Sequence, residues 1–216
     1  MTDKSIHNES AEKETFRLEA FSDAVFAIAV TLLALELKVP HLEPNAPPSE
    51  LLTQLLVQWP QYFALVTGFA TILVTWVGHH QIFKMVGRVD AYLLYSNGLL
   101  LLAVTLFPFA TALLGDYITH PSANIAVVIY AGLGLFTNVA WNLMWWSITH
   151  KRRLLNPKVS AAQVATVSKQ TFGGIPIYLF ATIIGYFNAN IGIAILTGLW
   201  ILWIVVGFMA QASEDR

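Results

Sequence analysis

Long apolar blocks occupy most of this 216-residue chain, and they constrain its fold more than any other feature. A helix that crosses a bilayer needs about 20 mostly apolar residues, whereas a membrane β-strand needs only ~10 with strict alternation. The blocks have the helical length and show no alternation. They lie at residues 20–38, 61–82, 91–114, 123–147, 172–187 and 190–211. We therefore predict an all-α integral membrane protein with six transmembrane helices.

The composition agrees with this class and excludes several others. Hydrophobic residues make up 56% of the chain and charged residues 12%, which is about half the charged share of ordinary soluble domains. The formal charge of -1 leaves no basic surface for a phosphate backbone, so no nucleic-acid partner is expected. The absence of cysteine removes thiolate metal sites and cysteine nucleophiles. Phosphate-loop, serine-elbow and metalloprotease motifs are also missing, so we expect no enzyme, no metal and no resident cofactor.

The basic residues predict the orientation of the helices, because cytoplasmic loops collect Lys and Arg. With the N-terminus inside, only Lys38 of the 12 basic residues falls outside. The others are Lys4, Lys13, Arg17, Lys84, Arg88, Lys151, Arg152, Arg153, Lys158, Lys169 and Arg216. We expect a multi-pass protein of the plasma membrane with both termini cytoplasmic: an N-terminal segment at 1–19, a six-span domain at 20–211 and a tail at 212–216.

Local signals predict several helix boundaries. Ser49 is expected to N-cap a short amphipathic helix that runs on into the second span, with Pro60 as a kink. The fifth span is expected to be the shortest, because it opens at Gly173 and Pro176. Pro108 predicts a kink inside the third span.

Polar residues inside the apolar blocks point to a cluster in the inner third of the bilayer. Asp23 lies in the first span, His79 and His80 end the second, and Asn97 begins the third. An unpaired carboxylate is costly at this depth, so a hydrogen-bonded cluster is expected. It can be a structural clasp, a proton relay through Asp23 and a histidine, or a metal site. Adjacent histidines on a helix diverge by ~100°, which makes the metal site the weakest of the three.

One face of the first span carries almost no polar group. At ~100° per residue, Asp23 points nearly opposite to this face. The face consists of Phe21, Ala24, Ile28, Thr31, Leu32 and Leu35. It can be an ordinary packing face, or a pore wall in which Ile28 and the leucines form a dewetting constriction and Thr31 supplies a hydroxyl ring.

The start of the first span carries a specific motif. Arg17, Phe21, Ser22 and Asp23 fit the pattern RxxxFSD, which opens the first helix in the transmembrane protein 175 family, the endosomal and lysosomal potassium channels and their bacterial relatives. Further similar strings follow in order along the chain. They are Trp59-Pro60-Gln61, Trp76 with His79-His80-Gln81-Ile82-Phe83, and Asn97 with Pro108-Phe109. The chain thus resembles this family most clearly over residues 17–115.

The resemblance implies a potassium-preferring cation leak channel, a homotetramer in the lipid bilayer, with a fold unlike that of ordinary potassium channels. It implies a pore that conducts monovalent cations, potassium above all, and that is lined by the first helix of each subunit. Ile28 would form the constriction, and Thr31, Leu32 and Leu35 would continue the pore face. The motif residues would tie the first helix to the second and third. Their implied partners are Trp76, His80 and Asn97.

Other functions remain open on the residues alone. A proton-coupled secondary transporter would use Asp23 and His80, although such transporters usually show inverted repeats and interrupted helices, for which this chain gives little sign. A membrane scaffold would leave the motif purely structural. Proton permeation through the same pore is a further alternative.

Overall fold

The computed structural model describes residues 3–214, and the surroundings of the side chains for residues 12–150 and 152–205. Lys4, Lys151 and Arg216, which contribute to the predicted orientation, lie outside the described side chains. Within the described part every regular element is helical, and the one β contact is an isolated bridge between Val86 and Leu155. The prediction of an all-helical chain is therefore confirmed.

The helices follow the apolar blocks and extend beyond them. α1 spans Asp3–Leu32 and continues as the 3-10 turn η1, Leu33–Glu36. The remaining elements are α2 (Pro48–Val57), α3 (Trp59–Phe83), α4 (Ala91–Tyr117), α5 (Ala123–Thr149), η2 (His150–Arg152), α6 (Ala161–Phe187) and α7 (Ala189–Glu214). Pro108 lies inside α4.

Most of these helices are suited to a membrane. Five stretches are long and apolar enough to cross it: Glu12–Glu36, Trp59–Phe83, Ala91–Tyr117, Ala123–Thr149 and Ala161–Phe187. A shorter apolar stretch covers Ala189–Val205, the part of α7 whose side chains are described. The chain is therefore a helical membrane protein, with at least five helices of spanning length.

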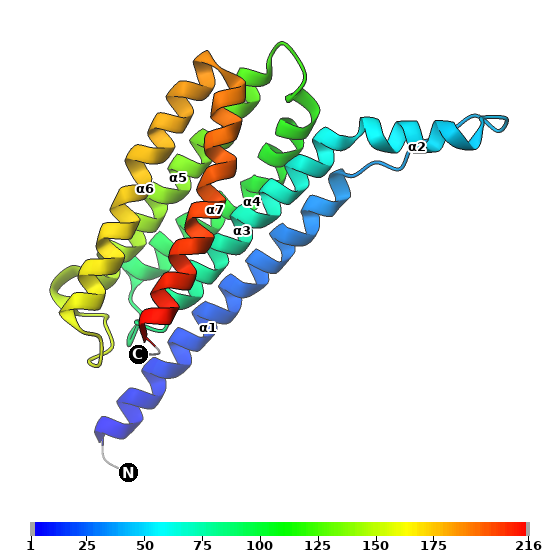
Figure 1. Cartoon of the computed structure of the whole chain (residues 1–216). Helices are drawn as coiled ribbons and strands as arrows, with labels where there is room; N and C mark the ends of the chain where they lie inside the picture. The colour runs from blue at the N-terminus through cyan, green and yellow to red at the C-terminus, as the bar shows by residue number, and fades with distance from the viewer. Residues whose placement is uncertain (1–2, 215–216) are drawn as a thin grey trace.

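The helices form one bundle in which α4 is central. α4 packs against α1, α3 and α5, while α6 packs against α5 and α7. α1 lies along one edge of the bundle and α6 along the opposite edge (Figure 1). α1 begins and α7 ends at the same end, and α2 projects from the other end (Figure 1). α2 has no buried residue.

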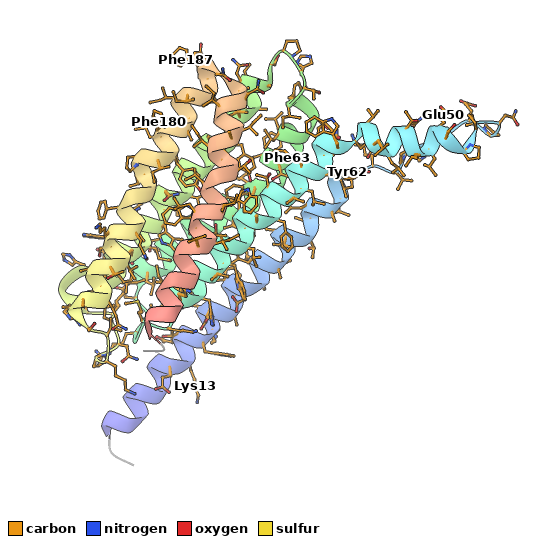
Figure 2. The ribbon with its side chains drawn as sticks, viewed as in Figure 1. Lys13, Glu50, Tyr62, Phe63, Phe180 and Phe187 are labelled. Atoms are coloured by element: carbon orange, nitrogen blue, oxygen red, sulfur yellow. The ribbon has the colours of Figure 1, made fainter. Side chains whose placement is uncertain are left out.

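Close packing holds the bundle together. Lipid tails are as apolar as leucine, so van der Waals fit between helices replaces the hydrophobic effect as the main attraction. Phe26, Ile72 and Phe107 fill one layer of the interior, and Leu93 and Met144 belong to a second layer. Other apolar side chains point outward: Phe180 and Phe187 stand on the outer side of α6 (Figure 2). Outward apolar groups are expected where lipid is the solvent.

The predicted start of the fifth span is wrong. α6 begins at Ala161, well before Gly173, because Ser160 and Gln163 form a capping box that starts a helix in polar sequence. This polar first part then runs without a break into the apolar block. Pro176 lies inside α6, and this span is not the shortest.

The predicted boundaries around the amphipathic helix are also wrong. Pro47 rather than Ser49 is the N-cap of α2, and Pro48 occupies its first turn. The chain turns at Gln58, so α2 and α3 are separate helices. Pro60 lies in the first turn of α3, where its missing N–H has no partner to lose, and it does not kink a continuous helix.

α6 and α7 touch backbone to backbone at a pair of glycines. A Cβ atom added to Gly192 would lie 2.7 Å from the Gly185 Cα and 2.6 Å from a methyl of Val127. The Gly185 backbone cannot rotate away as a flexible side chain would. Gly192 therefore sets the distance between these two helices.

We expect Gly192→Ala to destabilise the protein by about 1–3 kcal/mol, the usual cost of overpacking a tight site. The measurement is thermal unfolding of the purified protein in detergent. Gly198→Ala is the matched control on the same helix, because a Cβ there meets nothing within 4 Å. Equal stability of the two variants would contradict the close approach.

Candidate functional site

α1 has two faces with opposite surroundings. Ser22, Phe26, Ala29 and Leu33 are buried against the bundle, at spacings of three and four residues. Leu18, one turn earlier, is also buried. The helix is thus held along a single stripe, and the opposite stripe is free in the single chain.

The free stripe is the apolar face expected from the sequence. Ile28 is 59% exposed and Leu35 75% exposed, and Thr31 and Leu32 are exposed beside them. The hydroxyl of Thr31 donates to the carbonyl oxygen of Ile28 at 2.8 Å. Its single proton is therefore used within the helix, and the lone pairs of the oxygen remain available to an outside group.

Three helices meet in a directed chain of hydrogen bonds. The hydroxyl of Ser22 donates to the carbonyl oxygen of Leu18 at 2.9 Å, so it can only accept from Asn97, whose Nδ2 lies 3.0 Å away. The Oδ1 of Asn97 then faces the Nε2 of His79 at 3.0 Å and accepts its proton. Asn97 thereby joins α3, α4 and α1 through one buried amide.

A second set of contacts ties α1 to α3 alone. The indole Nε1 of Trp76 donates to the Oδ1 of Asp23 at 2.9 Å, and the Nδ1 of His80 lies 2.9 Å from the Oε1 of Glu19. Glu19 and Asp23 are four residues apart on α1, and Trp76 and His80 are four residues apart on α3. Because the two helices run in opposite directions, the two contacts lie one helical turn apart, like successive rungs of a ladder. We call these contacts, together with those of Ser22, Asn97 and His79, the clasp.

The structure brings together most of the predicted clasp residues. Ser22 and Asp23 meet Asn97 and Trp76 as the resemblance implied, whereas His80 contacts Glu19 instead of a motif residue. The remaining motif residues, Phe21 and Arg17, do not point into the clasp, since both are exposed.

Glu19 is a clasp residue that the sequence analysis did not name, and His79, which it placed in the expected polar cluster, was not among the partners that the resemblance implied. His79 is fully buried, and its ring stacks on Phe83 at 4.2 Å and lies 5.4 Å from Phe26. Adjacent histidines on a helix diverge by ~100°, so the two rings cannot share one position in the bundle. This angle indicates that the two histidines have different surroundings, but it does not reveal which of them is buried.

The arrangement bears on proton transfer. Asp23 is bonded to an indole N–H, which does not ionise at ordinary pH, and not to a histidine. The Nδ1 of His79 has no partner among the described residues, so a second proton on this ring would meet no acceptor. Among the described residues, the contacts of Asp23 are those of a structural tie between α1 and α3.

Comparison with known proteins gives consistent matches. A family model described as "Endosomal/lysosomal potassium channel TMEM175" matches residues 17–108. A protein of Chamaesiphon minutus named as a potassium channel is 43% identical over 85% of this chain and 90% of its own length. The crystal structure of a lysosomal potassium-selective channel TMEM175 homolog from this organism superposes with a TM-score of 0.81 at 40% identity, covering 90% of this chain and 98% of that one. A mouse protein named endosomal/lysosomal proton channel TMEM175 is 22% identical over 78% of this chain but only 33% of its own length.

The helical bundle, the free apolar face of α1 and these matches define a membrane protein of the ion-channel class. The chain belongs to the TMEM175 family. This family consists of channels and not of enzymes, and the predicted relationship is confirmed.

We expect Asn97→Ala to lower the stability of the folded protein by about 1–3 kcal/mol, because it strands the buried N–H of His79. Thermal unfolding in detergent measures the loss. Thr105→Ala is a control on the same helix, since the Thr105 hydroxyl is exposed and bonds only within α4. A loss no larger than that of the control would show that Asn97 does not hold the three helices together.

Proposed function

We propose that this protein is a potassium-preferring cation channel in which four copies surround a pore lined by α1. The observation that carries the proposal is the free stripe of α1, with Ile28 and Leu35 exposed while the opposite stripe is clasped to the bundle. A single chain holds one such helix, so a pore requires symmetric assembly. The potassium-channel name of the Chamaesiphon relative supports the choice of ion.

The constriction is assigned to Ile28, with Leu32 and Leu35 continuing the same wall. Four bulky apolar side chains around an axis exclude water when they close, and such a ring gates an ion path by dewetting. No charged side chain is required at this level. Permeation would then depend on how far the four α1 helices separate.

The preference for potassium is assigned to Thr31. Its hydroxyl proton is used by the carbonyl of Ile28, so four Thr31 oxygens would present lone pairs to a cation. Such a ring replaces part of a hydration shell and favours the more weakly hydrated ion. The selectivity expected from one hydroxyl ring is modest.

We further propose six spans, with α7 as the sixth, and both termini on the cytoplasmic side of a plasma membrane. The support is the distribution of basic residues, together with the common end of the bundle at which α1 begins and α7 ends. Lys38, between α1 and α2, would lie outside.

Proton permeation through the same pore is a second candidate. It is favoured by the mouse relative, which is named a proton channel. Replacing potassium by an impermeant cation while keeping a pH gradient separates the two currents. A secondary transporter is less well supported, because Asp23 accepts from the indole of Trp76 and does not contact His80 as that function would require.

We expect vesicles that contain the purified protein to release potassium faster than sodium or a large organic cation. We expect Ile28→Asn to increase the flux and to reduce the selectivity, because the polar side chain wets the constriction. Ile125→Asn is a matched control, since Ile125 is similarly exposed but lies on α5. Wild-type flux no greater than that of empty vesicles would refute the channel. An unchanged flux in Ile28→Asn would show that the constriction is formed by another residue.

We expect Thr31→Val to lower the potassium-to-sodium flux ratio several-fold while keeping total flux within about tenfold, because valine matches the shape of threonine but lacks the oxygen. The measurement is the flux of each ion from the same vesicle preparation. Thr105→Val, at an exposed site on α4, controls for loss of a hydroxyl elsewhere. If the ratio is unchanged, Thr31 does not contribute to selectivity.

A further inference from the structure

Two segments at the end of the bundle opposite α2 are joined by backbone contacts into one surface. One segment, 84–90, links α3 to α4, and the other, 150–160, links α5 to α6. Their backbone contacts are Gly87 N to Leu154 O at 2.8 Å, Asn156 N to Met85 O at 2.9 Å and the bridge between Val86 and Leu155. Leu154 and Leu155 are buried beneath these contacts. The two segments therefore hold fixed positions relative to each other.

This surface carries an excess of positive charge. Besides Arg153, which is paired with Asp90, its exposed basic side chains among the described residues are Lys84, Arg88, Arg152 and Lys158. We call these four the basic platform. The sequence of the two segments holds one carboxylate, Asp90, and it is already used. Asp90 pairs with Arg153 and caps α4 by accepting from the backbone N–H of Leu93 at 2.9 Å. The two segments themselves therefore hold no free carboxylate to neutralise the platform.

Local geometry further fixes the platform. Arg152 has a left-handed backbone, with φ at 52°, and its guanidinium donates to the carbonyl oxygen of Val159 at 2.6 Å. The preference of basic residues for cytoplasmic loops explains their number, but it requires no rigid shared surface.

An exposed tryptophan lies close to the platform in the chain. Trp146, near the end of α5, is 58% exposed, and its ring is 4.9 Å from that of His150. Exposed tryptophan at the end of a spanning helix is typical of the boundary between hydrocarbon and water. The basic platform begins directly beyond this boundary, where lipid phosphates are found.

We propose that the basic platform binds the headgroup of an anionic phospholipid from the adjacent leaflet. The phosphate would lie against Arg88 and Lys158, with Lys84 and Arg152 beside it. A lipid held there would bridge the α3–α4 and α5–α6 connections and so stabilise the end of the bundle from which α4 starts. This binding does not depend on ion conduction.

The test is competition between lipids on the purified full-length protein. The detergent-solubilised chain is incubated with equal amounts of phosphatidylglycerol and phosphatidylcholine, and retained lipids are counted by mass spectrometry. Since a basic residue near an anionic lipid is worth roughly fivefold in occupancy, we expect phosphatidylglycerol to be retained at least about tenfold more. The triple variant K84Q/R88Q/K158Q should lose most of this preference and keep its folded helix content. It leaves Arg152 and Arg153 in place, because their side chains hold the loops.

A charge-matched control separates a site from general attraction. K13Q/K38Q/K169Q removes three exposed basic residues elsewhere and should keep the preference within twofold. The proposal is overturned if the wild type retains both lipids equally, if both triple variants lose the preference alike, or if millimolar glycerol phosphate displaces the lipid. In the last case the platform would be a site for a soluble anion.

Discussion

The rest of this structure depends on the two hydrogen bonds made by the side chain of Asn97. Its amide accepts from His79 on α3 and donates to Ser22 on α1, so one side chain of α4 satisfies groups on two neighbours. In a bilayer no water replaces a lost partner, and an unpaired buried polar group costs far more than at a surface. The three helices are thus constrained in depth and in rotation. The Asp23–Trp76 and Glu19–His80 rungs repeat this constraint along the same pair of helices.

The rotation of α1 is the functional consequence. Because Ser22 and Asp23 must face α3 and α4, the stripe with Ile28, Thr31 and Leu35 turns away from the bundle. A polar motif at one end of the helix therefore places an apolar surface along the rest of it.

Sequence reasoning was accurate where one physical rule acted alone. Apolar length located the helices, and the wheel of α1 separated Asp23 from Ile28. It failed where rules competed. At α6 the capping box of Ser160 and Gln163 started the helix before the apolar block, and at Gln58 the chain turned where a continuous helix was expected. For the adjacent histidines, periodicity showed that the two rings point in different directions but did not show that His79 is the buried one.

The sequence by itself determined that the protein lies in lipid, the approximate positions of its long helices, and the motif that identifies its family. These depend on the cost of placing residues in hydrocarbon, which is local to each segment. The tertiary structure decided which histidine is buried and that Glu19 is the partner of His80. It also decided that the segments 84–90 and 150–160 form a single surface. Those features join residues that are far apart in the chain, so only the packing of whole helices brings their partners within hydrogen-bonding distance.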